Sequence, residues 1–344
     1  MSSQEMSTGR RRLMRVYVRP RSAAESKRHP RAKEAAPRGE ALAPGFKATP
    51  KHDLKFRGGR TIAHLAYVNF FVGGATAWKQ SDVDAINRAL AGAMSDTKLN
   101  NVMCQYFGND AITTSFVGSH FTGTQKPKKV TETSAKKTIT DLFRSGQLNG
   151  LSFPSTVVNL LLPSGTVLTD GTGPGKEHDD DDDTPGPQVA GSPEAEEASS
   201  LEGLGGYHGS VDVGQQRIYY SVGVYSERLA NGSDNGIPVF DQPWKNIVAT
   251  FYHELNEART DPDVDDAIRT GTVEGVIGWN SDDGEECGDF PVFEAGDAGN
   301  LKLVFQEVPV QSSTAPVQFQ YSNAVHGPEG PISSPHAVKA HQLT

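Results

Sequence analysis

The run Thr156-Val-Val-Asn-Leu-Leu-Leu162 is the most strongly apolar stretch of the sequence. A nearly continuous apolar run of this length is typical of a strand covered on both faces, so we expect it to be the central strand of a sheet. Other strand-like runs cover residues 62–72, 102–107, 113–117 and 217–225. Helix-like spacing follows Ser81, which is the expected N-cap of that helix, and recurs from Ser134. This alternation predicts an α/β fold with a mixed central sheet and flanking helices.

The chain divides by composition into a basic arm, a body and a short tail. Residues 1–60 carry 16 Lys and Arg against 5 Asp and Glu, whereas residues 61–344 carry 17 against 37. We expect the arm to be disordered, because its few apolar side chains could not offset the loss of chain entropy on folding. We expect a single domain over residues 61–330, since neither a repeat nor a second core pattern is visible. Residues 331–344 form the tail.

Residues 170–200 interrupt the pattern of the body. His178 is followed by the five aspartates Asp179–Asp183 and then by sequence rich in proline and glutamate. Calcium binding is one interpretation, but calcium loops space their oxygen ligands around a glycine, and consecutive aspartates repel one another. The favoured interpretation is a flexible acidic insertion at the surface.

The composition limits the classes of partner that the chain is expected to bind, but it does not indicate the cellular compartment. No segment has the ~18 apolar residues of a membrane span. The basic arm could bind nucleic acid, but the negative body would repel phosphate, so we do not expect a nucleic-acid partner. Arg10-Arg-Arg12 resembles an export signal, although the apolar stretch after it is short and is interrupted by Arg15. Cys104 and Cys287 could form one disulfide, and their spacing fits neither a zinc motif nor a redox motif.

The chemistry is expected on one helix, which contains Phe251-Tyr-His-Glu-Leu-Asn-Glu-Ala-Arg-Thr-Asp-Pro262. Asp241 predicts its N-cap, with a proline in the first turn, and the proline at the end of the segment stops the helix at about Asp261. On such a helix His253 and Glu257 lie one turn apart on the same face, and Asp261 continues their row.

Adjacent His253 and Glu254, followed by a potential ligand four residues after the histidine, resemble the helix of zinc proteases. There His-Glu-x-x-His supplies two zinc ligands and a glutamate that activates water. Here the second ligand position is Glu257, a carboxylate that also suits calcium or manganese. The alternative for so short a match is a solvated helix face with a contact between histidine and glutamate.

Two further segments could complete this site. His208 lies among glycines and small residues, where the backbone can approach a ligand closely. The loop from Trp279 to Asp289 holds five carboxylates, and any of them that lay near the helix would need a cation. Simpler interpretations are a histidine in a turn and a polar surface turn after a tryptophan.

In this order the segments resemble the EXORDIUM and phosphate-induced protein family. Its plant members pair Gly-x-His-Gly with His-Glu-Leu-Ala-Glu-x-x-Thr-Asn-Pro, followed by Ala-Trp-Tyr and Glu-Ile-x-Asp-Leu-Cys. Bacterial relatives carry Thr-Asp-Pro and often a late Ser-Asn-Ala. The matching segments are Gly-Tyr-His208-Gly-Ser, His253-Glu-Leu-Asn-Glu257-Ala-x-Thr-Asp261-Pro, Gly-Trp279, Gly-Glu285-Glu286-x-Gly-Asp289 and Ser322-Asn-Ala324.

The resemblance implies a secreted protein, since the plant members act outside the cell in growth responses associated with the cell wall. No signal peptide is visible in this chain, so its localisation stays open. Plant members have cysteines that flank Gly-x-His-Gly, and this chain has none there. Cys287 precedes Asp289 by two residues, whereas the family cysteine follows that aspartate, so the family's disulfide pattern is not transferred.

Two functions are expected from these residues. The first is a metal-dependent hydrolase related to zinc metallopeptidases, with zinc favoured, calcium as the alternative metal, and a peptide or a cell-surface polymer as substrate. Glu254 would be its general base, and its metal ligands would be His208, His253 and Glu257. The residues that would support these ligands or replace one of them are Asp261, Glu286 and Asp289. The second function is a non-catalytic extracellular or surface protein with a structural metal site, which the carboxylate-rich surroundings favour.

Overall fold

The computed structural model describes residues 16–17, 42–108, 110–171, 197–264, 272–311 and 313–336. Its main sheet has six strands in the order β1-β8-β9-β6-β3-β4. Strands β9, β6, β3 and β4 are parallel, whereas β8 is antiparallel to β9, and β1 is antiparallel to β8. These strands are β1 (Val16–Tyr17), β3 (His64–Val72), β4 (Thr113–Thr122), β6 (Thr156–Leu161), β8 (Leu204–Val213) and β9 (Gln216–Gly223). The expected mixed sheet is confirmed, with the apolar run 156–161 at its centre.

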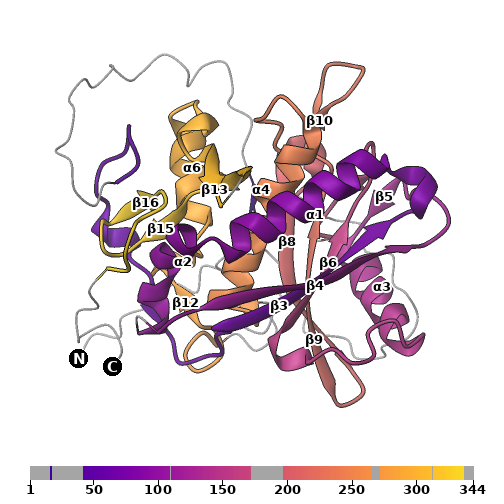
Figure 1. The fold of residues 1–344 in the computed structure, drawn as a ribbon, viewed down its shortest axis with the longest axis horizontal. Helices are drawn as coiled ribbons and strands as arrows, with labels where there is room; N and C mark the ends of the chain where they lie inside the picture. Colours follow the sequence, from indigo (N-terminus) through magenta and orange to yellow (C-terminus); the bar gives the residue numbers. More distant parts are fainter. Residues whose placement is uncertain are drawn as a thin grey trace, which may run out of the picture.

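Helices cover both faces of this sheet (Figure 1). Helices α1 (Gln80–Ser95) and α4 (Pro243–Thr260) pack on one face, and α3 (Glu132–Arg144) packs on the other. Side chains of β3 alternate between the two cores, since Tyr67 contacts the first and Val68 the second. A strand buried on both faces requires this alternation.

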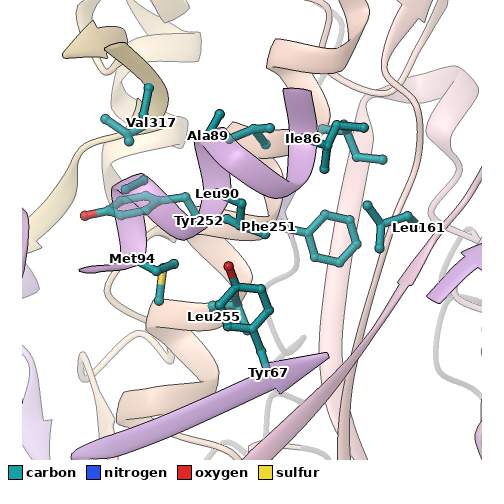
Figure 2. Packing of buried hydrophobic residues seen from close by; sticks show 14 of the residues in the cluster. Tyr67, Ile86, Ala89, Leu90, Met94, Leu161, Phe251, Tyr252, Leu255 and Val317 are labelled. Atoms are coloured by element: carbon teal, nitrogen blue, oxygen red, sulfur yellow. The ribbon is translucent and has the colours of Figure 1, made fainter. Parts of the chain in front are cut away.

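The core beneath α1 and α4 fixes the helix that carries the predicted motif. Figure 2 shows Ile86 and Leu90 of α1 beside Phe251 and Leu255 of α4, with Tyr67 of the sheet close by. All five side chains are buried. Burial of a side chain of this size contributes about 1.5–3 kcal/mol to stability, so α4 is held firmly along its apolar side.

Smaller elements surround this framework. The remaining helices are α2 (Thr97–Met103) and α6 (Asp289–Asp297), with short 3₁₀ turns at Pro50–His52, Ala75–Ala77, Cys104–Phe107, Phe153–Ser155, Ser200–Glu202 and Leu301–Leu303. Two-stranded pairs join β2 (Lys55–Phe56) to β12 (Trp279–Asn280), β5 (Lys129–Val130) to β7 (Val167–Leu168), β10 (Glu227–Arg228) to β11 (Asp234–Asn235), β13 (Phe305–Val310) to β14 (Ser313–Gln318), and β15 (Gln320–Ser322) to β16 (Gly327–Glu329). Within the described ranges, no helix combines the length and the hydropathy that a membrane span needs.

Three local expectations are wrong. Residues 102–107 form the end of α2 and a 3₁₀ turn, because Asp96 caps α2 by accepting from the backbone N–H groups of Lys98 and Leu99. Ser81 lies inside α1, which begins after Lys79. Asp241 does not cap α4 but pairs with Lys245 at 2.7 Å, so the helix begins one residue later than expected.

Residues 42–60 belong to the body rather than to the predicted arm. Backbone groups of Leu54 exchange hydrogen bonds with the side-chain amide of Asn323 at 2.8 and 2.7 Å, and Phe56 of β2 pairs with Trp279. These partners lie more than two hundred residues away in sequence, so local composition could not reveal them. The rest of the predicted arm apart from 16–17, most of the acidic insertion (172–196) and residues 337–344 of the tail lie outside the described residues.

Candidate metal centre

Two glycines bring α4 close to strands β8 and β9. A Cβ atom on Gly206 would lie 2.9 Å from Oε1 of Glu254, and one on Gly223 would lie 2.7 Å from the ring of Phe251. Because glycine has no side chain, the helix can approach the sheet at these positions. The strand register pairs His208 with Ser221, and both side chains lie on the α4 face of the sheet. The glycine-rich sequence before His208 therefore belongs to a buried strand, not to a turn.

Seven ionisable side chains gather where β8, α4 and the start of α6 meet. Each is at most 5% exposed. They are His208 from β8, His253, Glu254, Glu257 and Asp261 from α4 and its C-cap, and Glu286 and Asp289 from the α6 end. The structure brings together every residue that the sequence named for the site.

His253 is oriented as a metal-binding histidine would be. Its Nδ1 lies 2.8 Å from the amide oxygen of Gln318, whose own amide nitrogen donates to the carbonyl oxygen of Gly288. An amide oxygen only accepts, so Nδ1 carries a proton, and in the neutral ring Nε2 presents a lone pair. That Nε2 lies 2.9 Å from Oε2 of Glu257 but has no hydrogen-bond partner. The two atoms therefore approach each other closely without a hydrogen bond between them.

The turn before α6 fixes the carboxylates of Glu257 and Asp289. The backbone N–H of Gly288 donates to Oε1 of Glu257 at 3.0 Å, and the N–H of Glu286 donates to Oδ2 of Asp289 at 3.0 Å. Each carboxylate thus has one oxygen in a hydrogen bond to the backbone, and the other oxygen of Glu257 lies against His253. Oδ1 of Asp289 has no hydrogen-bond partner although it is buried. One ligand atom each from His253, Glu257 and Asp289 lies within 4.8 Å of the other two.

His208 contacts a different part of the cluster. Its Nε2 lies 3.0 Å from the carbonyl oxygen of Asp261, and its Nδ1 lies 3.2 Å from Oε2 of Glu254 and 3.8 Å from Oε2 of Glu257. Since a carbonyl oxygen only accepts, Nε2 carries a proton. The three residues His208, Glu254 and Glu257 form a second group with ligand atoms within 4.8 Å. Glu257 is common to both groups, while the two histidines belong to different ones.

Burial makes the negative charge of this cluster unfavourable. It raises the pKa of Asp289 to about 8, with a further contribution from the neighbouring Glu257, and it raises the pKa of Asp261 to about 7. Burial also raises the pKa values of Glu257 and Glu286 well above their usual range, and adjacent carboxylates add to the effect. No lysine or arginine of the described ranges forms an ion pair with these four carboxylates. A bound cation would supply the missing positive charge.

The loop from Trp279 to Asp289 is not the surface turn that was the simpler interpretation. Trp279, Glu285 and Glu286 are buried. Glu286 faces the cluster, with Oε1 at 3.5 Å from Nε2 of His208 and no hydrogen-bond partner. Glu285 instead pairs with His52 at 2.7 Å, outside the centre. Adjacent residues therefore point to opposite sides of the loop.

Two residues of the centre were not found from the sequence. Gln318 sets the proton of His253, and Gly288 leaves room for the ring, because a Cβ at that position would lie 2.3 Å from Nδ1. The glycine beside Asp289 was a signal that could have been used, whereas an isolated glutamine in a strand gives none. Cys104 and Cys287 are both free and buried, so they do not form the disulfide that was considered.

No family model, no curated protein and no solved structure matches the chain. The resemblance to the EXORDIUM and phosphate-induced protein family therefore stays an expectation from the motifs. The centre has to be interpreted from its own geometry.

Proposed function

We propose that this chain is a metal-dependent hydrolase whose divalent ion binds to His253, Glu257 and Asp289. The observation that carries the proposal is the 2.9 Å approach of His253 Nε2 to Glu257 Oε2 with no hydrogen bond between them. A neutral His253 and an ionised Glu257 both present lone pairs at this contact, and Asp289, whose buried Oδ1 has no hydrogen-bond partner, belongs to the same group. A cation bound between these atoms would offset the repulsion of that ionised state.

The ligand set favours zinc over calcium. Ligand atoms of tetrahedral zinc lie about 3.3 Å apart when each bond is near 2.0 Å, which is close to the observed 2.9 Å. Calcium prefers six to eight oxygen ligands, and an imidazole nitrogen does not suit it. Three protein ligands also leave a fourth zinc position for water, as in catalytic sites.

Glu254 is the proposed general base. It follows His253 directly on α4, and its Oε2 is held 3.2 Å from Nδ1 of His208. A zinc ion in this position would lower the pKa of a bound water and polarise a substrate carbonyl. Glu254 would then accept the proton of that water and return it to the leaving group.

His208 has a different role here from the expected one. Both of its nitrogens already have partners, the carbonyl oxygen of Asp261 and the carboxylate of Glu254. We therefore assign it to positioning Glu254 and move Asp289 into the ligand set, the replacement that the sequence had left open. Glu286 and Asp261 stay as supporting residues beside His208.

The second candidate, a structural cation in a non-catalytic protein, is favoured by the burial of the centre. His253, Glu254, Glu257 and Asp289 are each about 1% exposed, and a substrate must reach a catalytic ion. In this alternative the ion would only hold α4, α6 and β8 together.

Metal content and peptidase activity of three variants separate the two candidates. We expect the purified protein to hold one zinc, His253→Ala to lose it, and Glu254→Gln to keep it while hydrolysis of a casein substrate falls by at least about a hundredfold. His326→Ala is the matched control, because this histidine pairs with Asp53 outside the centre. Zinc in a protein without activity would leave only the structural role, and activity that survives Glu254→Gln would contradict the assigned base.

A further inference from the structure

Strand β8 carries His208 and is the second strand of the main sheet, so it would be an edge strand without β1. The segment Val16–Tyr17 of the basic arm forms β1 on this side. It is antiparallel to β8, with Val16 opposite Gly206 and Tyr17 opposite Leu204. A piece of extended chain far from β8 in sequence has therefore been added as a strand.

The position of β1 coincides with the proposed catalytic residues. Gly206, which is opposite Val16, is the residue whose Cβ would lie 2.9 Å from Oε1 of Glu254. Strand β1 also lies against α6, the helix that begins with the ligand Asp289. The added strand thus lies between β8 and α6 at the edge of the centre.

The composition of β8 suits recognition of a backbone rather than of particular side chains. Gly205, Gly206 and Gly209 leave much of the strand without side chains, so another chain can approach closely. Strand addition obtains its affinity from main-chain hydrogen bonds, which any extended polypeptide can supply. Residues 1–41 carry 11 Lys and Arg against 4 Asp and Glu, and the remainder carries 22 against 38, so opposite net charges attract this segment to the body.

We propose that β8 and α6 form a binding site for an extended polypeptide, which adds antiparallel to β8 beside Glu254, and that Val16–Tyr17 occupies this site and closes it. Strand binding itself does not depend on the proposed function. The claim that the bound polypeptide is the substrate does rest on that function. In its hydrolysis the water oxygen bonds to the carbonyl carbon, the C–N bond breaks, and Glu254 transfers the water proton to the leaving amine.

The arm would accordingly be an inhibitory segment of the same chain, which lowers the activity of the wild type without abolishing it. A tethered segment has an effective concentration in the millimolar range, so an added peptide competes with it poorly. Disruption of β1 should leave the outer edge of β8 accessible to another extended chain.

The test uses the full chain with Val16→Pro and Tyr17→Pro, since proline cannot donate a main-chain hydrogen bond. The matched control carries Ser22→Pro and Ala23→Pro, in the same arm but outside β1. The probe is a fluorescent synthetic peptide with the sequence of residues 10–22, compared by anisotropy with a peptide of equal charge that has prolines at positions 16 and 17. Binding is measured with zinc and in EDTA.

We expect the native peptide to bind the Val16/Tyr17 variant at least about tenfold more tightly than it binds the wild type or the control variant. The proline peptide should bind all of them weakly. Equal binding of both peptides would mean that charge alone attracts them, and this result would overturn the proposal. An absence of peptide binding would overturn it as well. Strand-specific binding without zinc content or hydrolysis would sink the proposed function only, and zinc-dependent hydrolysis without strand-specific binding would sink this inference only.

Discussion

Two groups of buried polar side chains lie on the same face of the same sheet, and only in one of them does each hydrogen-bond donor meet an acceptor. In the first, the hydroxyl of Ser221 donates to Asn159, the Asn159 amide donates to Asn69, the Asn69 amide donates to Asn87, and the Asn87 amide donates to Ser119. A donor meets an acceptor at each step, at 2.7–2.9 Å. In the metal centre, where His208 of β8 pairs with Ser221 of β9, Nε2 of His253 and Oε2 of Glu257 meet without a hydrogen bond.

This difference in hydrogen bonding indicates a different role for each group. A chain of amides and hydroxyls satisfies itself and fixes the register of the strands, at no cost in buried charge. The centre combines carboxylates of raised pKa with a histidine whose Nε2 has no hydrogen-bond partner. Folding alone leaves buried polar atoms of the centre without partners, and a bound cation would pair with them.

The largest expected change in stability therefore comes from zinc binding at the metal centre. Zinc at about a thousandfold excess over its Kd should stabilise the protein by about 4 kcal/mol, because it binds the folded chain only. Urea unfolding in zinc and in EDTA measures this gain. If the two unfolding curves coincide, the centre does not bind zinc and the contrast with the amide chain disappears.

The next effect is on the amide chain. Asn159→Leu should lower the free energy of unfolding by about 2–3 kcal/mol, because it leaves the Ser221 hydroxyl and the Asn69 carbonyl without partners. The loss should be equal in zinc and in EDTA. Asn87→Ala, at the half-buried end of the chain, is the control and should cost less. A loss that depends on zinc would mean that the two groups are coupled.

A smaller effect of opposite sign is expected from Glu257→Gln. In EDTA the variant should be more stable than the wild type by about 1 kcal/mol, because an uncompensated buried carboxylate is removed. In zinc it should be less stable, since a ligand is lost. Urea titrations of both proteins in both buffers test this reversal. A variant that is destabilised to the same extent in both buffers would indicate that Glu257 only packs.

The smallest effect is the pH dependence of the metal-free protein. Burial raises the pKa of Asp261 to about 7 and that of Asp289 to about 8, above the usual value of 3.8, so the folded chain holds these protons where the unfolded chain has lost them. Their contribution to stability is complete below pH 4 and is lost progressively as the pH rises from there through the folded-state values of about 7 and 8. The Tm in EDTA should therefore fall faster between about pH 4 and 8 than that of Asp289→Asn. Parallel curves would show that Asp289 is already ionised.

The sequence predicted the parts of the centre that depend on one element. His253 and Glu257 share a face because a helix repeats every 3.6 residues, and this period can be read from the motif. The amide that holds His253 in one tautomer comes from Gln318, and the backbone N–H that holds Glu257 comes from Gly288. Both contacts depend on how distant segments pack. The same reason explains why residues 42–60 were assigned to the arm and why β1 was not foreseen.

Calorimetric titration of zinc into the metal-free wild type and into Asp289→Asn, with Asp53→Asn as a matched carboxylate control outside the centre, tests the central claim most directly. The account predicts one zinc per chain for the wild type and the control, and an affinity at least about tenfold lower for Asp289→Asn. The same zinc affinity in all three proteins, or no binding to the wild type, would contradict it.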